Sequence, residues 1–281
     1  MKFILPAICS LLTISVSAQV KIVEKAIIKM KTEITFPENM GGNSPGEGDR
    51  VMMMGGAGGM EANTTMYYRG DFSKVESTSD FGNNIIITDR KNKKTTTLTE
   101  AMGRKVGFYS TEEDELAMRS RMDSARNARR DSLEKAGIPI ARPAKPEIEY
   151  TNETKKIAGY TCKKAIIKSK NQRGEVNSTI VWYCPDFKMA EGFSFGGGGG
   201  RGMMSMAGVN GLDQIEGFPM EYQIERTNGM KMHMTVTKVQ LDAAIEDKVF
   251  EIPKGFDIKP MKDMQGGDGR MIMRMGSGGN Q

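Results

Sequence analysis

Apolar residues alternate with charged and polar ones over residues 20–36, a pattern that gives a β-strand one buried face. The apolar side chains sit mainly at even positions: Val20, Ile22, Ala26, Ile28, Met30, Ile34 and Phe36. The odd positions carry mostly lysine and glutamate. This period of two residues predicts a long, half-buried strand.

The same strand signature returns along most of the chain. It covers "TTMYYRGDFSKV" (64–75), "NNIIITDRKNKKTTTLTE" (83–100) and "KVGFYS" (105–110). The second stretch predicts a hairpin with a polar turn over residues 89–94. Further strands follow in the second half of the chain. The sequence therefore predicts a mainly β fold of mostly antiparallel strands with a minor helical part.

One segment, residues 110–137, has a strong helical signature. Ser110 and Glu113 have the spacing of a capping box, and Glu112, Glu113 and Asp114 place negative charge in the first turn. Gly137 gives a natural end. The apolar stripe of this segment is weak, so we expect a solvated helical insertion on the surface. A helix that docks a partner is the alternative.

The first 18 residues have the layout of a secretory signal peptide. Lys2 precedes an apolar stretch over residues 3–16, and small residues end it at Ala18. We expect cleavage there and export to the periplasm or beyond, with no transmembrane segment in the mature chain.

We also expect one β domain over 19–260, flexible Gly/Met-rich loops at 37–61 and 188–211, and a disordered tail at 261–281.

Cleavage would leave two cysteines, Cys162 and Cys184, one on each side of a predicted hairpin. The turn is centred on Arg173, and both cysteines are equally far from it. Directly opposed residues of antiparallel strands have Cα atoms about 4.5–5.5 Å apart, which a disulfide can bridge. The spacing favours a cross-strand disulfide over a redox-active or metal-binding pair.

A second hairpin, around Asn228 and Gly229, contains the unusual run "MKMHMTV". A two-residue turn would set Met232 and Met234 opposite Glu225 and Gln223. A three-residue turn with Gly229 in the left-handed conformation would instead group the apolar residues of both strands on one face. Burial favours the second register. His233 then lies on the other face, away from the thioethers.

The candidate ligand-binding residues follow from this register and from the preceding strand. They are Met220, Tyr222, Ile224, Met230, Met232, Met234 and Trp182. Methionine is a flexible apolar filler, and its thioether is also a ligand for Cu(I). The alternative to a core or apolar pocket is therefore a soft-metal site at Met230, Met232 and Met234.

Enzyme chemistry has little support in the sequence. The chain has a single histidine, His233, so multi-histidine metal sites are excluded and a serine triad would have to use that residue. The two matches to G-x-S-x-G, at residues 42–46 and 192–196, fall in the Gly/Met-rich loops rather than between a strand and a helix, and no cofactor motif is recognised. Carboxylate-pair chemistry stays open because such pairs form only in the fold. The chain has no lysine- or arginine-rich block, so nucleic acid is not expected as a partner.

Four stretches, "ETKKIAGYTCKKAII", "TIVWYCPDF", "IEGFPMEYQI" and "VFEIPKGFDI", together resemble a known group of proteins. The group consists of uncharacterised exported bacterial proteins of the LolA/LolB-like lipoprotein-carrier superfamily, and the stretches are also similar to the GLPGLI family of envelope proteins. The residues that carry the resemblance are Lys156, Ile157, Gly159, Tyr160, Cys162, Trp182, Gly217 and Pro219.

The resemblance implies a curved antiparallel sheet, a LolA-like half-barrel, around an apolar cavity. It also implies binding of lipids or acylated proteins, with no catalytic residue carried over. Our expectation is an exported, non-enzymatic protein that holds a lipophilic ligand on an apolar sheet face, with peripheral association with the envelope. The alternatives are Cu(I) or Ag(I) binding through methionine and a structural or interaction role in the cell envelope.

Overall fold

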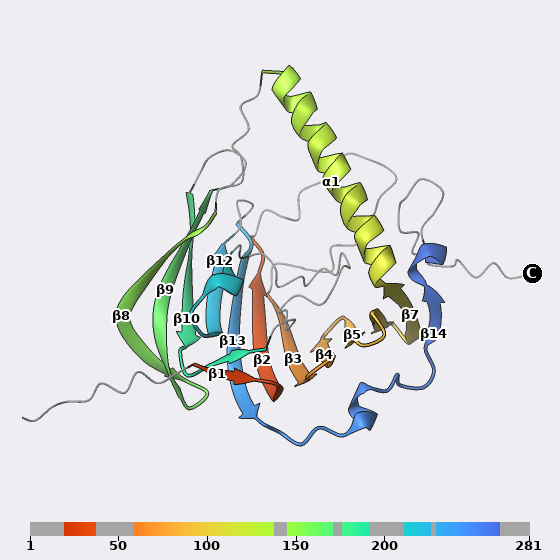
Figure 1. Ribbon diagram of the computed structural model, residues 1–281, viewed down its shortest axis with the longest axis horizontal. Helices are drawn as coiled ribbons and strands as arrows, with labels where there is room; N and C mark the ends of the chain where they lie inside the picture. Colours follow the sequence, from red (N-terminus) through yellow and green to blue (C-terminus); the bar gives the residue numbers. More distant parts are fainter. Residues whose placement is uncertain are drawn as a thin grey trace, which may run out of the picture.

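The computed structural model describes residues 20–37, 59–137, 145–170, 176–190, 209, 211–225 and 229–264. Most of the strands form one twelve-stranded sheet in the order β14-β7-β6-β5-β4-β3-β2-β13-β12-β10-β9-β8. Neighbouring strands are antiparallel except for β14 and β7. Figure 1 shows this sheet as a single curved layer from which one long helix, α1, projects. The predicted fold class, mainly β with a curved antiparallel sheet and an inserted helix, is confirmed.

The first half of the sheet is built from β2 (Lys25–Thr35), β3 (Met60–Arg69), β4 (Phe72–Ser79), β5 (Gly82–Asp89), β6 (Lys94–Ala101) and β7 (Arg104–Thr111). Helix α1 (Glu112–Lys135) follows. The second half contains β8 (Glu147–Ile157), β9 (Tyr160–Lys170), β10 (Val176–Cys184), β12 (Phe218–Glu225), β13 (Lys231–Leu241) and β14 (Asp257–Pro260). A separate pair consists of β1 (Lys21–Val23) and β11 (Phe187–Met189), and short 3-10 helices lie at Leu212–Gln214, Asp247–Phe250 and Met261–Met264.

The alternation in residues 25–35 places the even positions of β2 in the core, as predicted. The predicted alternation of buried even positions and exposed odd positions is wrong before Glu24, where Ile22 is exposed and Val23 is buried. The cause is that β1 leaves the large sheet and pairs in parallel with β11. A sequence period shows which residues share a face, but it cannot show that a strand changes partner.

The N-cap of helix α1 lies one residue later than predicted, and the helix itself begins at Glu112. Its N-cap is Thr111, whose side chain accepts a hydrogen bond from the Asp114 backbone N–H, so the capping box is Thr111–Asp114 rather than Ser110–Glu113. Ser110 is still part of β7, where it is buried and donates to Glu115. No residue of α1 is buried, which confirms the prediction of a surface helix. Gly137, with φ of 72°, follows its end.

Acid is expected to loosen the start of α1 through Asp114. The Thr111 backbone N–H and hydroxyl donate to this carboxylate at 2.9 and 2.8 Å and hold its pKa below the ordinary 3.8. A depressed folded-state pKa gives stability that is present above pH 3.8 and is lost as the pH falls through the folded value. Circular dichroism at 222 nm should therefore show a loss of helix on acidification that Asp114→Asn removes.

The matched control for this titration is Glu113→Gln, which changes a neighbouring first-turn carboxylate outside the capping box. It should leave the acid transition in place. An Asp114→Asn protein that loses helix over the same pH range as the parent would show that the capping box does not control the acid response.

Three predicted segment boundaries need correction. The loop predicted for 37–61 ends earlier, because Met60 and Glu61 already belong to β3. The loop predicted for 188–211 begins later, because β11 continues to Met189 and pairs with β1. The predicted tail begins too early, since Met261 is buried. The signal peptide at 1–18, most of both loops and residues 265–281 lie outside the described residues.

Candidate ligand-binding face

Strands β12 and β13 pair in the register that burial favoured in the sequence. Tyr222 lies opposite Met234, and Ile224 lies opposite Met232. Gly229 has φ of 81°, the left-handed conformation that the three-residue turn requires. The prediction of this hairpin and its register is confirmed.

The shared side of these strands continues across β2. Ile34 lies opposite Met232, and Met30 lies opposite Val236. We call this surface the methionine face, defined by Met220, Tyr222, Ile224, Met232, Met234, Met30 and Ile34. All seven side chains are buried, with Met220 and Met234 at 0% exposure, while Met230 is half-buried at its margin. The face is thus packed into the core rather than open to solvent.

Trp182 does not belong to the methionine face, so the prediction that it lines one face together with the methionines is wrong. Its neighbour Val181 lies opposite Tyr222, whereas Trp182 itself lies opposite Glu221. Successive side chains of a strand point to opposite faces, so Trp182 lies on the other side of the sheet. There it is half-buried, with the Lys155 ammonium 4.8 Å from its ring centroid.

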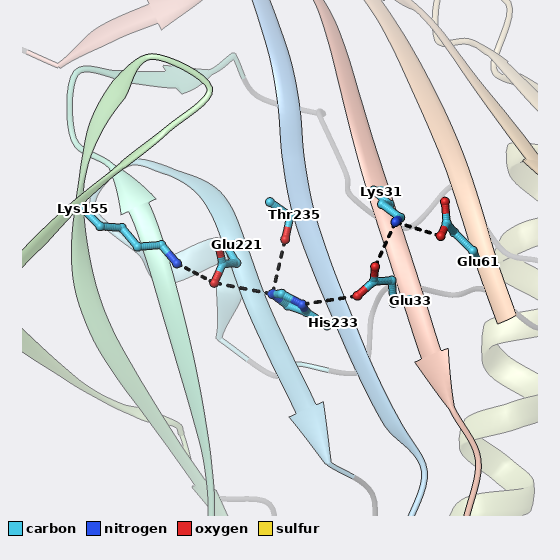
Figure 2. A network of polar contacts seen from close by, with 7 residues as sticks. All are labelled: Lys31, Glu33, Glu61, Lys155, Glu221, His233 and Thr235. Carbon is cyan, nitrogen blue, oxygen red and sulfur yellow. Dashed lines mark hydrogen bonds and ion pairs between the residues drawn. The ribbon is translucent and has the colours of Figure 1, made fainter. Parts of the chain in front are cut away.

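A chain of charged side chains crosses this second side, which we call the polar face. Figure 2 shows it running from Lys155 through Glu221, His233 and Glu33 to Lys31 and Glu61. His233 lies between two carboxylates, with Nε2 3.4 Å from Glu221 and Nδ1 3.8 Å from Glu33. Its Nε2 is also 3.3 Å from the Thr235 hydroxyl. The imidazole therefore links β12, β13 and β2 on the side away from the methionines.

The outer charges of the polar face compensate one another. Lys31 contacts Glu33 at 2.9 Å and Glu61 at 2.8 Å, and these hydrogen bonds raise the pKa of Lys31. The hydrogen bond from Lys31 is in turn the main cause that lowers the pKa of Glu33, and His233 contributes less. These charges are mutually satisfied, and all of them are partly exposed, so each pair contributes little to stability.

The contact between Lys155 and Glu221 joins two strands that are not neighbours in the sheet. Their charged atoms are 2.6 Å apart, although β9 and β10 lie between the two strands that carry them. Neighbouring strands are about 4.8 Å apart, so these two long side chains reach across β9 and β10 on the polar face.

The predicted alternative metal site uses Met230, Met232 and Met234. Met232 and Met234 lie on one side of β13, Met230 directly precedes the strand, and His233 points to the polar face as the sequence predicted. Across the described ranges, no three His, Cys, Asp or Glu side chains come together in a way that could hold a metal ion.

Cys162 and Cys184 lie next to the aligned β9–β10 ladder, which follows the predicted register up to Lys163 opposite Tyr183. Both are free thiols in the structure, so the predicted disulfide is not present there. Burial is the main cause that raises the pKa of Cys162 to about 11 and that of Cys184 to about 12. Both sulfurs are therefore neutral at physiological pH, which argues against a nucleophilic role.

Among the helices that the structure describes, none has both the length and the apolar character needed to cross a membrane.

Several solved structures are weakly similar to the chain. PNGF-II in its C2 crystal form is 17% identical over 84% of this chain and 31% of its own, with a TM-score of 0.34. MucB in complex with MucA(peri) is 9% identical over 81% of this chain and 55% of its own, with a TM-score of 0.35. A domain described as that of an outer membrane lipoprotein-sorting protein from Vibrio parahaemolyticus is 7% identical over 80% of this chain and 88% of its own, with a TM-score of 0.27.

The chain thus spans about a third of PNGF-II and about half of MucB. Similarities this weak carry no information about function. No curated protein sequence matches the chain. Residues 48–256, most of the chain, match the family described as "Domain of unknown function (DUF4412)". The chain therefore belongs to the DUF4412 family.

Proposed function

We propose that this protein is an exported, non-enzymatic binding protein that holds a lipophilic ligand, a lipid or the acyl chain of a modified protein, against the methionine face. The supporting observation is the continuous apolar surface that Met220, Tyr222, Met232 and Met234 form with β2. Such a surface binds by removing apolar area from water.

The methionines suit this role because their side chains are unbranched and flexible. They can repack around ligands of different shape at low cost. Since the face is buried among the chain's own residues, binding requires it to separate from the segments that cover it. The bound ligand would then replace contacts that the chain makes with itself.

Native mass spectrometry of the protein, purified without detergent from its own compartment, tests the proposal. We expect mass additions that match lipids or acylated peptides and that disappear after extraction with organic solvent. Met232→Gln, which puts a polar group of similar length on the face, should reduce the bound fraction. Met102→Gln is the control, because Met102 is 73% exposed. A parent protein that carries no apolar molecule, and takes none up from lipid vesicles, would contradict the proposal.

The competing function is soft-metal binding through Met230, Met232 and Met234. The last two share one side of β13, and Met230 directly precedes that strand. Cu(I) favours thioether ligands. An anaerobic Cu(I) titration against a competing chelator separates the two functions. Stoichiometric uptake that Met232→Leu abolishes would favour the metal, because leucine keeps the apolar face and removes the sulfur.

A further inference from the structure

Thr32 is a polar residue in the middle of the methionine face. It belongs to β2, between Met30 and Ile34, and it lies opposite Met234 on one neighbouring strand and Ala62 on the other. Its exposure is 3%, and its four neighbours on the face are buried as well. A hydroxyl group is therefore enclosed by apolar side chains.

This hydroxyl has no hydrogen-bond partner among the residues that the structure describes. The hydroxyl of Thr64, on the adjacent strand β3, donates instead to Ser77 at 3.1 Å. An enclosed water molecule needs several polar partners, and the four side chains around Thr32 offer none. Valine has almost the same shape as threonine and would avoid the cost of burying an unpaired hydroxyl.

The surroundings of Thr32 restrict what its partner could be. On the strands β12, β13, β2, β3 and β4, the described residues of this face include no charged side chain. A carboxylate or phosphate group would be buried there without a counter-charge, which is strongly unfavourable. A neutral acceptor attached to an apolar chain fits both the hydroxyl and its apolar neighbours.

We infer that Thr32 is a specificity-determining residue that donates a hydrogen bond to the uncharged carbonyl of an acyl ester or amide bound on the methionine face. The inference rests on the proposed function and narrows its ligand class. It predicts that the protein distinguishes an acyl ester from a hydrocarbon of the same length, and that Thr32 is the reason.

Three probes of equal chain length test this inference by competition with a fluorescent apolar reporter. They are methyl laurate, dodecane, and laurate at pH 8, where the acid is ionised. The parent protein should bind the ester about five- to tenfold more tightly than the hydrocarbon, the effect of one net hydrogen bond. Laurate should bind more weakly than the ester.

Thr32→Val should bring the affinities for ester and hydrocarbon to within about twofold, without weakening hydrocarbon binding. Its melting temperature should equal or exceed that of the parent, because the unpaired hydroxyl is gone. Thr32→Ser keeps the hydroxyl and should retain the preference for the ester. This variant tests the inference even where the valine variant folds poorly. Thr78→Val, an exposed position of β4, is the control.

The outcomes separate the two proposals. A Thr32→Val protein that still prefers the ester overturns the role of Thr32 and leaves the proposed function standing. If laurate binds more tightly than the ester, the inference that Thr32 donates to an uncharged carbonyl is overturned. If the parent binds neither ester nor hydrocarbon, the proposed function fails and the inference fails with it.

Discussion

Met234→Ala is expected to lower the free energy of unfolding by about 2–5 kcal/mol, the range for large-to-small changes in a protein core. Met234 is fully buried, opposite Tyr222 on β12 and Thr32 on β2. Alanine removes most of the buried side chain, and a sheet that is hydrogen-bonded on both sides of β13 cannot close over the gap. Urea denaturation followed by circular dichroism measures the loss.

Met122→Ala is the matched control, because Met122 lies on α1 with 48% exposure and alanine is a good helix former. Its effect should stay within about 0.5 kcal/mol. Equal effects at both positions, or a loss below about 1 kcal/mol at Met234, would show that β12 and β13 do not form the packed face described above.

Oxidation of Cys162 and Cys184 to a disulfide is expected to raise the free energy of unfolding by about 3 kcal/mol, because it closes the loop of residues 163–183 in the unfolded chain. Extending the β9–β10 register by one residue beyond Lys163 and Tyr183 would place the two cysteines opposite each other, and export would expose them to an oxidising environment. Denaturation with and without reductant measures the gain. The response to reductant should vanish in the Cys162→Ala/Cys184→Ala double variant.

A pair that stays reduced in the exported protein would behave differently. Thiol titration would find two groups that react only after unfolding. Burial raises the pKa of both thiols from an ordinary 9.0 to about 11 and about 12. A raised thiol pKa gives stability that is complete below pH 9.0 and is lost as the pH rises toward the folded values. Alkaline loss of stability without any effect of reductant would therefore contradict the disulfide.

The parts of the fold that the sequence predicted best are those that local rules determine. Both hairpin registers follow from turn length and from burying apolar residues on one side, as at Tyr222 and Met234. The surface position of α1 follows from its weak apolar stripe. The sequence placed the N-cap of α1 one residue too early, because both Ser110 and Thr111 are followed, three residues later, by an acidic residue.

The features that the sequence did not reveal depend on strands that are distant in the chain. β13 pairs with β2, which brings Glu33 beside His233 and Thr32 beside Met234. Neither neighbour can be found from a local pattern. Trp182 was misplaced for a related reason: its face is set by the β10–β12 pairing, in which it lies opposite Glu221.

The most direct measurement of the central proposal is methyl NMR of the methionines during titration with methyl laurate, with assignments from single Met→Leu variants. If the methionine face is the binding site, the Met30, Met232 and Met234 methyl signals should shift together and saturate at one ligand per chain. The signals of Met102 and Met122, both exposed, should stay in place. Saturable shifts confined to Met102 or Met122, or no shift at all, would contradict it.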